Sequence, residues 1–144
     1  FLVGRAGVVP LLAGEQLLSD DGRFHYVGGR IPLPPEFARR AMMLGSRTIA
    51  AVPGLRGFVG VDLVLGQNNL KSQISDFKSQ ISDIKFGDTV IEINSRLTTS
   101  YIGLRRLART NLAEQMMRVA AGEEFGLIEW QSGAISFTAD GRVA

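Results

Sequence analysis

The sequence predicts an α+β fold in which helices pack on one face of an antiparallel β-sheet. Several short apolar runs, each bounded by glycine or proline, are typical of strands. Two other segments repeat their apolar residues at helical spacing. Along the chain the predicted strands form groups of three, two and two, with a helix between successive groups. This order favours antiparallel neighbours over alternating βαβ units, and the length of 144 residues suits one domain.

The first 52 residues contain three predicted strands and a helix. Turn signals at residues 4–7 and 19–22 separate the strands, and prolines follow the last of them. The predicted strands are residues 1–3, 8–12 and 24–27, the last ending at Gly28. The helix is predicted over 36–52, because its apolar residues share one face while Pro53 and Gly54 end it.

The rest of the chain is predicted to hold four strands and a second helix. Asn111 and Glu114 have the spacing of a capping box at a helix start, and Gly122 suits the helix end. Between the two helices lie two apolar runs of strand length, followed by an irregular stretch. The predicted strands are residues 57–65, 88–94, 127–130 and 134–138.

Residues 67–86 differ from their surroundings, since they contain all three lysines and none of the 17 glycines. The sequence SQISDFK is followed at once by SQISDIK, and the apolar residues are spaced alternately four and three apart. That spacing is the a/d pattern of a coiled coil, which predicts a dimerisation element. The alternative is an insertion, helical or disordered, on a hairpin tip, because two heptads rich in serine and aspartate form a weak helix.

Removing residues 67–86 joins two predicted strands through a glycine-rich turn. Gly66 then stands beside Gly87, which is typical of a tight β-hairpin. Pairing these two glycines across the turn places Asp62 opposite Ile91 or Glu92. The hairpin therefore brings acidic residues together that lie thirty positions apart in the sequence.

Three oxygen-bearing side chains on this hairpin form a candidate metal site. Glu92 and Asn94 are two residues apart and therefore project from the same face of a strand, with Ile91 and Ile93 expected on the core face. Asp62 interrupts an apolar run, where a carboxylate is costly to bury unless something pairs with it. Carboxylate and amide oxygens suit Mg²⁺. The alternative is an exposed sheet face with ordinary polar residues.

The segment after the second strand offers residues suited to an anionic substrate. Arg96 has the planar guanidinium that matches phosphate or carboxylate groups. Thr98, Thr99 and Ser100 form a hydroxyl-rich loop, and substrate contacts concentrate on loops. The alternative for Arg96 is a surface salt bridge.

The composition excludes several classes of protein. Without cysteine there is no disulfide, thiolate nucleophile or zinc–sulfur site. No apolar run approaches the roughly 18 residues of a membrane helix, and the net charge of +2 with scattered arginines lacks the basic stripe of a nucleic-acid binder. The glycines form neither a P-loop nor a Rossmann motif. We therefore expect a cytoplasmic protein that binds neither membranes nor nucleic acid.

The residues from Val90 to Tyr101, preceded by the run 57–62, resemble the metal-binding end of an ATP-grasp enzyme. In that family an acid on one strand and a Glu-x-Asn pair on the next hold the magnesium ions that bridge the ATP phosphates. By position, the resemblance implies Asp62, Glu92 and Asn94 as ligands of Mg²⁺ or Mn²⁺. It implies Arg96 as the residue that contacts phosphate or the reacting carboxylate. The run through Tyr101 resembles a narrower branch that includes tyramine–glutamate ligase.

The resemblance implies that residues 1–144 are a partial ATP-grasp domain, the C-terminal lobe, with 67–86 inserted within it. The implied activity is that of a Mg-dependent carboxylate–amine ligase that uses ATP and forms an acyl phosphate. The N-terminal lobe, with its adenine-binding hinge and phosphate-binding lysine, would be a separate part, so we expect this lobe to be inactive alone. Gln16 is interpreted either as a residue facing the cleft or as a polar residue at a strand end.

Two features leave a second function open. The family string usually has proline where Ser95 stands, and losing proline's fixed φ loosens the placement of Arg96. The heptad window 67–86 also fits self-association. The alternative is therefore a non-catalytic ATP-grasp-like module that forms a homodimer through this window.

Overall fold

The structure is a computed structural model that describes residues 1–66 and 87–143. The predicted coiled coil at 67–86 lies outside the described residues. The elements in chain order are β1 (Leu2–Val3), β2 (Val8–Val9), β3 (Glu15–Leu18), β4 (Tyr26–Ile31), α1 (Pro35–Ala51), β5 (Gly57–Phe58), β6 (Gly60–Val64), β7 (Thr89–Asn94), α2 (Ser100–Leu107), α3 (Leu112–Ala120) and β8 (Ile135–Thr138). This mixture confirms the α+β class. No helix within the described ranges is long and apolar enough to cross a membrane.

The strands form three small antiparallel sheets, whereas the sequence predicts one. Their orders are β2-β1-β5, β3-β4-β8 and β6-β7. The physical reason lies in the run 57–65, which was expected to be a single strand. It breaks at the fully buried Val59, whose N–H donates to the carbonyl of Phe1 (2.9 Å). The part before the break pairs with β1 and the part after it pairs with β7, so one apolar run contributes to two sheets.

Four further elements differ between prediction and structure. Residues 127–130 do not form a strand, since only Trp130 makes an isolated bridge, to Ala108. Helix α2 stands where an irregular stretch was expected, and β3 was not predicted. Strand β4 was expected to end at Gly28 but continues to Ile31, because residues 28–31 pair with β8. The glycine allows this close approach, since a Cβ at this position would stand 2.1 Å from the carbonyl oxygen of Phe137.

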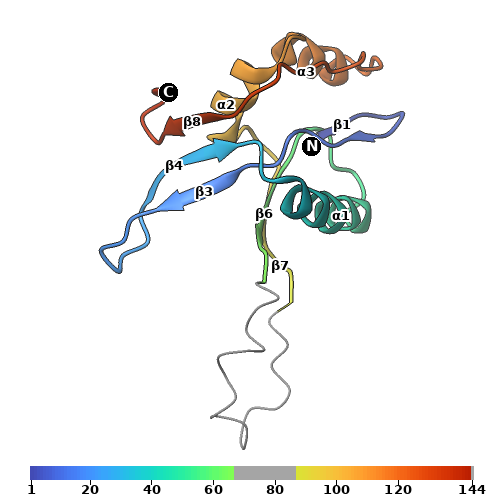
Figure 1. Cartoon of the computed structure of the whole chain (residues 1–144). Helices are drawn as coiled ribbons and strands as arrows, with labels where there is room; N and C mark the ends of the chain where they lie inside the picture. The colour runs from blue at the N-terminus through green and yellow to red at the C-terminus, as the bar shows by residue number, and fades with distance from the viewer. Residues whose placement is uncertain (67–86, 144) are drawn as a thin grey trace, which may run out of the picture.

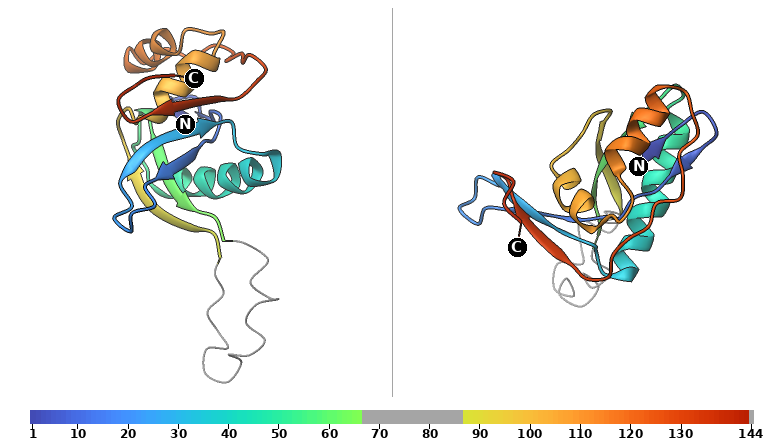
Figure 2. Two further views of the ribbon diagram at one scale, coloured as in Figure 1. Left: turned by 60° about the vertical axis from the view of Figure 1, so that its left-hand side comes forward. Right: turned by 90° about the horizontal axis from the view of Figure 1, so that it is seen from above.

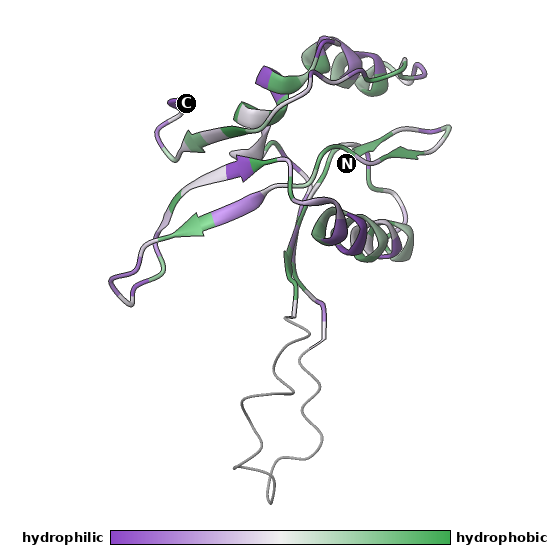
Figure 3. Ribbon diagram, in the orientation of Figure 1, coloured by the Kyte–Doolittle hydropathy of each residue, from purple (hydrophilic) through white to green (hydrophobic). Residues whose placement is uncertain are grey.

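The two predicted helices are confirmed. Helix α1 buries Ala41, Gly45 and Ile49 and mixes polar with apolar residues around its circumference (Figure 3). The Asn111 side chain caps α3 by accepting hydrogen bonds from the backbone N–H groups of Ala113 (3.1 Å) and Glu114 (3.3 Å). Gly122 follows that helix with φ +82°, the left-handed conformation that glycine adopts without strain.

Two apolar clusters form the core. The larger one joins α2 and α3 to the strands of two sheets, and its buried members include Leu2, Ile31, Leu104 and Phe137. The smaller cluster consists of Val3, Ile49 and Val59, with Val61 and Ile93 packed against it. This second cluster fixes one face of the β6–β7 hairpin on α1. The β3–β4 pair lies on the other side of the hairpin from α1 (Figures 1 and 2).

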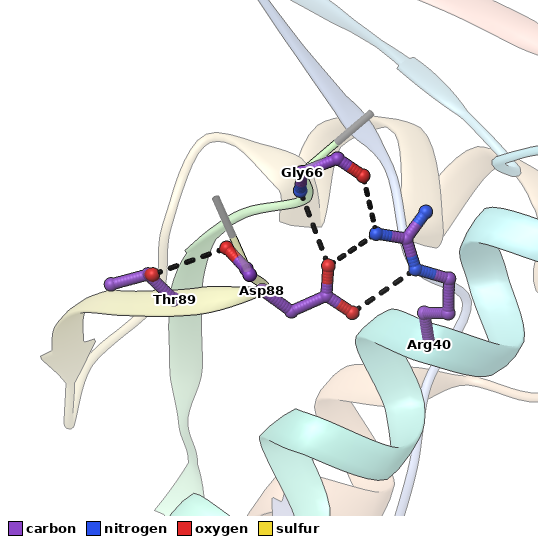
Figure 4. A network of polar contacts seen from close by, with 5 residues as sticks. Arg40, Gly66, Asp88 and Thr89 are labelled. Atoms are coloured by element: carbon purple, nitrogen blue, oxygen red, sulfur yellow. Dashed lines mark hydrogen bonds and ion pairs between the residues drawn. The ribbon is translucent and has the colours of Figure 1, made fainter. Parts of the chain in front are cut away.

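A polar network joins α1 to the end of the hairpin that adjoins residues 67–86 (Figure 4). The Arg40 guanidinium in α1 forms an ion pair with the Asp88 carboxylate and donates to the Gly66 carbonyl oxygen (2.6 Å). The same carboxylate accepts from the Gly66 backbone N–H (3.2 Å). Arg40 thereby joins both chain segments that flank residues 67–86 to one helix. We refer to Arg40, Gly66 and Asp88 as the clasp.

The clasp should contribute a salt- and pH-dependent part of the stability. Arg40 holds the pKa of Asp88 below its usual value through the hydrogen bonds between them. For a carboxyl with a depressed folded pKa, the stabilisation is present above the unfolded pKa of about 4 and disappears as the pH falls through the folded value. A double-mutant cycle with Arg40→Leu and Asp88→Asn, followed by urea unfolding, should show coupling at pH 7. That coupling should shrink in 1 M NaCl and vanish in acid. Equal coupling at pH 7 and pH 2 would contradict this role of the pair.

Candidate metal-binding site

The pairing of β6 with β7 places Asp62 directly opposite Glu92 and Gly60 opposite Asn94. This arrangement confirms the hairpin predicted by joining Gly66 to Gly87. The position of Asp62 was uncertain by one residue because the register shifts within the hairpin. Leu63 pairs with Val90, so Ile91 is an extra residue in β7 and forms a β-bulge.

The bulge changes which side chains face the site. Ile93 packs against the apolar cluster under α1, as expected. Ile91 was expected to face the core as well, but its side chain is 63% exposed, so that prediction was wrong. Strict alternation would place Ile91 and Ile93 on one face, and a single extra residue breaks this alternation. Ile91 therefore lies exposed beside Glu92.

The Asp62 carboxylate is held by two side-chain amides. Its Oδ1 accepts a hydrogen bond from Nε2 of Gln16 (2.9 Å), and its Oδ2 accepts one from Nδ2 of Asn94 (3.2 Å). Asn94 is buried, with 6% of its surface exposed. Since Asn94 donates through its nitrogen, its carbonyl oxygen Oδ1 is the atom left for other partners.

The surroundings of Asp62 disfavour its charged form. Burial raises its pKa above the usual value, and the negative charge of Glu92 raises it further. The positive charge of Arg96 and the hydrogen bonds from Gln16 and Asn94 oppose this shift without cancelling it. A divalent cation between the two carboxylates would relieve both the repulsion and part of the desolvation.

The remaining predicted residues are Arg96, Thr98 and Thr99, which lie between β7 and α2, and Ser100, the first residue of α2. Arg96 is exposed and donates to the Leu97 carbonyl oxygen (3.2 Å). Thr98 lies against β6, because a Cβ on Gly60 would stand 2.7 Å from Cγ2 of Thr98. The hydroxyls of Thr98 and Ser100 share a hydrogen bond of 2.7 Å, and Thr99 stands directly before α2. Of the predicted set, the structure thus brings Asp62, Glu92 and Asn94 together, with the loop hydroxyls beside them on the β6 side.

The ligand types of this site fit magnesium. Two carboxylates and one amide oxygen are hard ligands, and Mg²⁺ typically takes one or two carboxylates and fills its other positions with water or phosphate oxygens. No group of three or more His, Cys, Asp or Glu suited to a metal occurs in the described part of the chain. A calcium site, which needs more oxygen ligands from the protein, or a zinc site would be poorly supplied.

The family model of the ATP-grasp domain matches residues 1–100. The chain belongs to the ATP-grasp family. This match covers β1 to β7 and includes Asp62, Glu92, Asn94 and Arg96, so the hairpin just described lies within the family's conserved domain.

Two curated relatives of this ATP-grasp chain are tyramine–L-glutamate ligases. The protein from Methanocaldococcus jannaschii is 26% identical over 123 residues, which cover 85% of this chain and 32% of the relative. The protein from Methanocaldococcus fervens is 25% identical over 123 residues, covering 85% and 34%. The chain therefore spans about a third of the length of these relatives. No solved structure matches the chain.

Gln16 was interpreted from the sequence either as a residue facing the cleft or as a polar residue at a strand end, with no partner assigned. In the structure it contacts Asp62 directly, which favours the first interpretation. The partner lies 46 residues away and in a different sheet, so no local spacing connects the two. The one available signal was its position as a polar residue after Gly14 and Glu15 in a chain that resembles the ATP-grasp lobe.

The raised pKa of Asp62 is testable without metal. We expect a carbon-13 carboxyl titration by NMR to give Asp62 a pKa above the usual aspartate value. Glu92→Gln should lower this pKa, because it removes the second charge. Arg96→Leu should raise it further, because it removes a favourable charge. Unchanged titration of Asp62 in both variants would show that these charges are too distant to act on it.

The contact between Gly60 and Thr98 predicts a destabilising substitution with a specific rescue. Gly60→Ala should lower the free energy of unfolding by about 1–3 kcal/mol, because the new methyl overlaps Cγ2 of Thr98. Thr98→Ser removes Cγ2 and keeps the hydroxyl that bonds Ser100, so the double variant should recover most of the loss. Urea unfolding of all three variants measures this. Additive losses in the double variant would contradict the contact.

Proposed function

We propose that this chain is the C-terminal, metal-binding lobe of an ATP-dependent carboxylate–amine ligase. The supporting observation is the pairing of Asp62 with Glu92, with Asn94 hydrogen-bonded between the strands, in a chain of the ATP-grasp family. The proposed ligand set is Asp62, Glu92 and Asn94 for Mg²⁺ or Mn²⁺. The domain assignment of residues 1–144 to this lobe, with 67–86 inserted in it, is part of the proposal.

The proposed reaction forms an amide in two steps. The substrate carboxylate attacks the terminal phosphorus of ATP, which gives an acyl phosphate and ADP. The amine then attacks the acyl carbon, inorganic phosphate leaves and the amine gives up a proton. The metal ion, when bound, neutralises phosphate oxygens and orients them. The chain's own contribution is to hold the ion's ligands at a fixed register on one rigid hairpin.

Two further parts of the site suit the substrate groups. Arg96 is exposed and close enough for its charge to act on Asp62, and its guanidinium suits contact with the transferring phosphoryl group or the acyl phosphate. Thr98 and Thr99 precede α2, Ser100 is its first residue, and all three offer hydroxyls as donors and acceptors. We propose Arg96 as the catalytic residue and the three hydroxyls as substrate contacts.

The relatives' names suggest which substrates to test. Both relatives join tyramine to L-glutamate, so an amino acid carboxylate and a primary amine are the first pair to examine. The remaining two thirds of such a protein would supply the N-terminal lobe and the rest of the nucleotide site. The alternative function, self-association through residues 67–86, concerns residues outside those described and gains no support from the structure.

A magnesium titration tests the proposed site. At tenfold excess over its dissociation constant, Mg²⁺ should stabilise the chain by about 1.4 kcal/mol and raise the melting temperature by roughly 5 °C. Asp62→Ala and Glu92→Gln should remove this shift, because each removes a charged ligand. An equal shift in the wild type and in Asp62→Ala would contradict the assignment.

Turnover needs both lobes. The isolated chain should therefore release no ADP from ATP, whereas the complete ligase should release ADP when carboxylate and amine are both present. Glu92→Gln in the complete ligase should abolish that release. ADP release by the isolated chain that is lost in Glu92→Ala would show that this lobe is catalytic by itself.

A further inference from the structure

Gln16 reaches the metal-binding hairpin from a different sheet. It lies in β3, where it pairs with Gly29 of β4, and its amide nitrogen donates to Asp62 Oδ1 at 2.9 Å. Among the described residues, this is the one side-chain hydrogen bond between the β3-β4-β8 sheet and the β6–β7 hairpin. The contact is therefore specific and does not belong to a broad polar interface.

The backbone holds Gln16 in place. At its partner Gly29, a Cβ would stand 2.7 Å from the ring of Phe137 and 2.8 Å from the Glu15 carbonyl oxygen. β4 therefore lies close against β3 at this pair, and the buried Phe137 ring fixes the position from the β8 side. The side chain of Gln16 is exposed, but its backbone lies on a paired strand, and sites built on strands are positioned more precisely than sites built on loops.

Gln16 completes a two-point hold on the Asp62 carboxylate. Asn94 holds Oδ2 from within the hairpin, and Gln16 holds Oδ1 from outside it. With one donor the carboxylate can turn about its terminal bond, whereas with two donors its plane is fixed. Each oxygen keeps a second lone pair, so both hydrogen bonds are compatible with a cation on the carboxylate.

The residue type also matters. A lysine or arginine in this position would neutralise Asp62 and compete with a cation. The neutral amide of glutamine orders the carboxylate and leaves its charge for the metal. Partners that orient metal ligands in this way typically change metal affinity by 10–100-fold when removed.

We propose that Gln16 is a positioning residue that orients Asp62 for Mg²⁺ or Mn²⁺ and so links the β3-β4-β8 sheet to metal binding. This inference rests on the proposed function of the hairpin as a cation site. It adds that the affinity for the metal depends on a residue outside the Asp62, Glu92 and Asn94 set.

The test is the affinity of the chain for Mn²⁺, measured by electron paramagnetic resonance, which requires no turnover. We expect Gln16→Leu to bind Mn²⁺ about tenfold more weakly than the wild type. Gln131→Leu is the matched control, because it makes the same chemical change at a glutamine that donates instead to the Arg106 carbonyl oxygen (3.3 Å). Its affinity should equal that of the wild type. Gln16→Ser, too short to reach Asp62, replaces Gln16→Leu if the latter does not fold, as judged by urea unfolding.

The outcomes separate the two proposals. Wild-type binding of Mn²⁺ that is lost in Asp62→Ala and retained at full strength in the folded Gln16 variant would overturn the role of Gln16 alone. The same weakening in Gln131→Leu would also overturn it. Failure of the wild type to bind Mn²⁺ more tightly than Asp62→Ala would instead overturn the proposed function.

Discussion

The cross-strand pairing of Asp62 with Glu92 is the constraint on which the rest of the site depends. Two carboxylates at directly opposed positions repel each other, and partial burial raises the cost for Asp62. A protein gains nothing in stability from such a pair, which is a reason to expect a cation there. The bulge at Ile91 accommodates this pairing. Because Ile91 is an extra residue in β7, Glu92 pairs with Asp62 while the flanking residues still pair across the strands, Val90 with Leu63 and Ile93 with Val61.

The surrounding structure holds the hairpin at three places. Val61 and Ile93 pack on the apolar cluster under α1. The clasp joins the end of the hairpin next to residues 67–86 to the same helix, and Gln16 contacts the hairpin from β3. Two of these contacts come from α1 and the third comes from β3, so the hairpin is held from both sides. The ATP-grasp family match spans this hairpin, and the proposed function rests on that match together with the geometry.

Much of the site was predictable from local sequence, and the rest depended on tertiary contacts. Gly66 and Gly87 identify the hairpin, and the Glu-x-Asn spacing places two side chains on one face. The exposure of Ile91 was missed because a period of two cannot signal one extra residue. The contact of Gln16 with Asp62 was not predicted because the two residues lie in different sheets. Helix α2 was missed because its Gly103 weakens the helical pattern, although that glycine is required where the helix lies close to Phe137 and Ile31.

The most direct measurement of the central claim is where a paramagnetic ion binds this chain. Substoichiometric Mn²⁺ added to isotope-labelled protein broadens the NMR signals of nearby amides. The account predicts that broadening begins at Asp62, Glu92 and Asn94, spreads to Gln16, and is absent from the same residues in Asp62→Ala. Broadening centred on another acidic region, such as Glu123 and Glu124, with the hairpin signals unchanged, would contradict it.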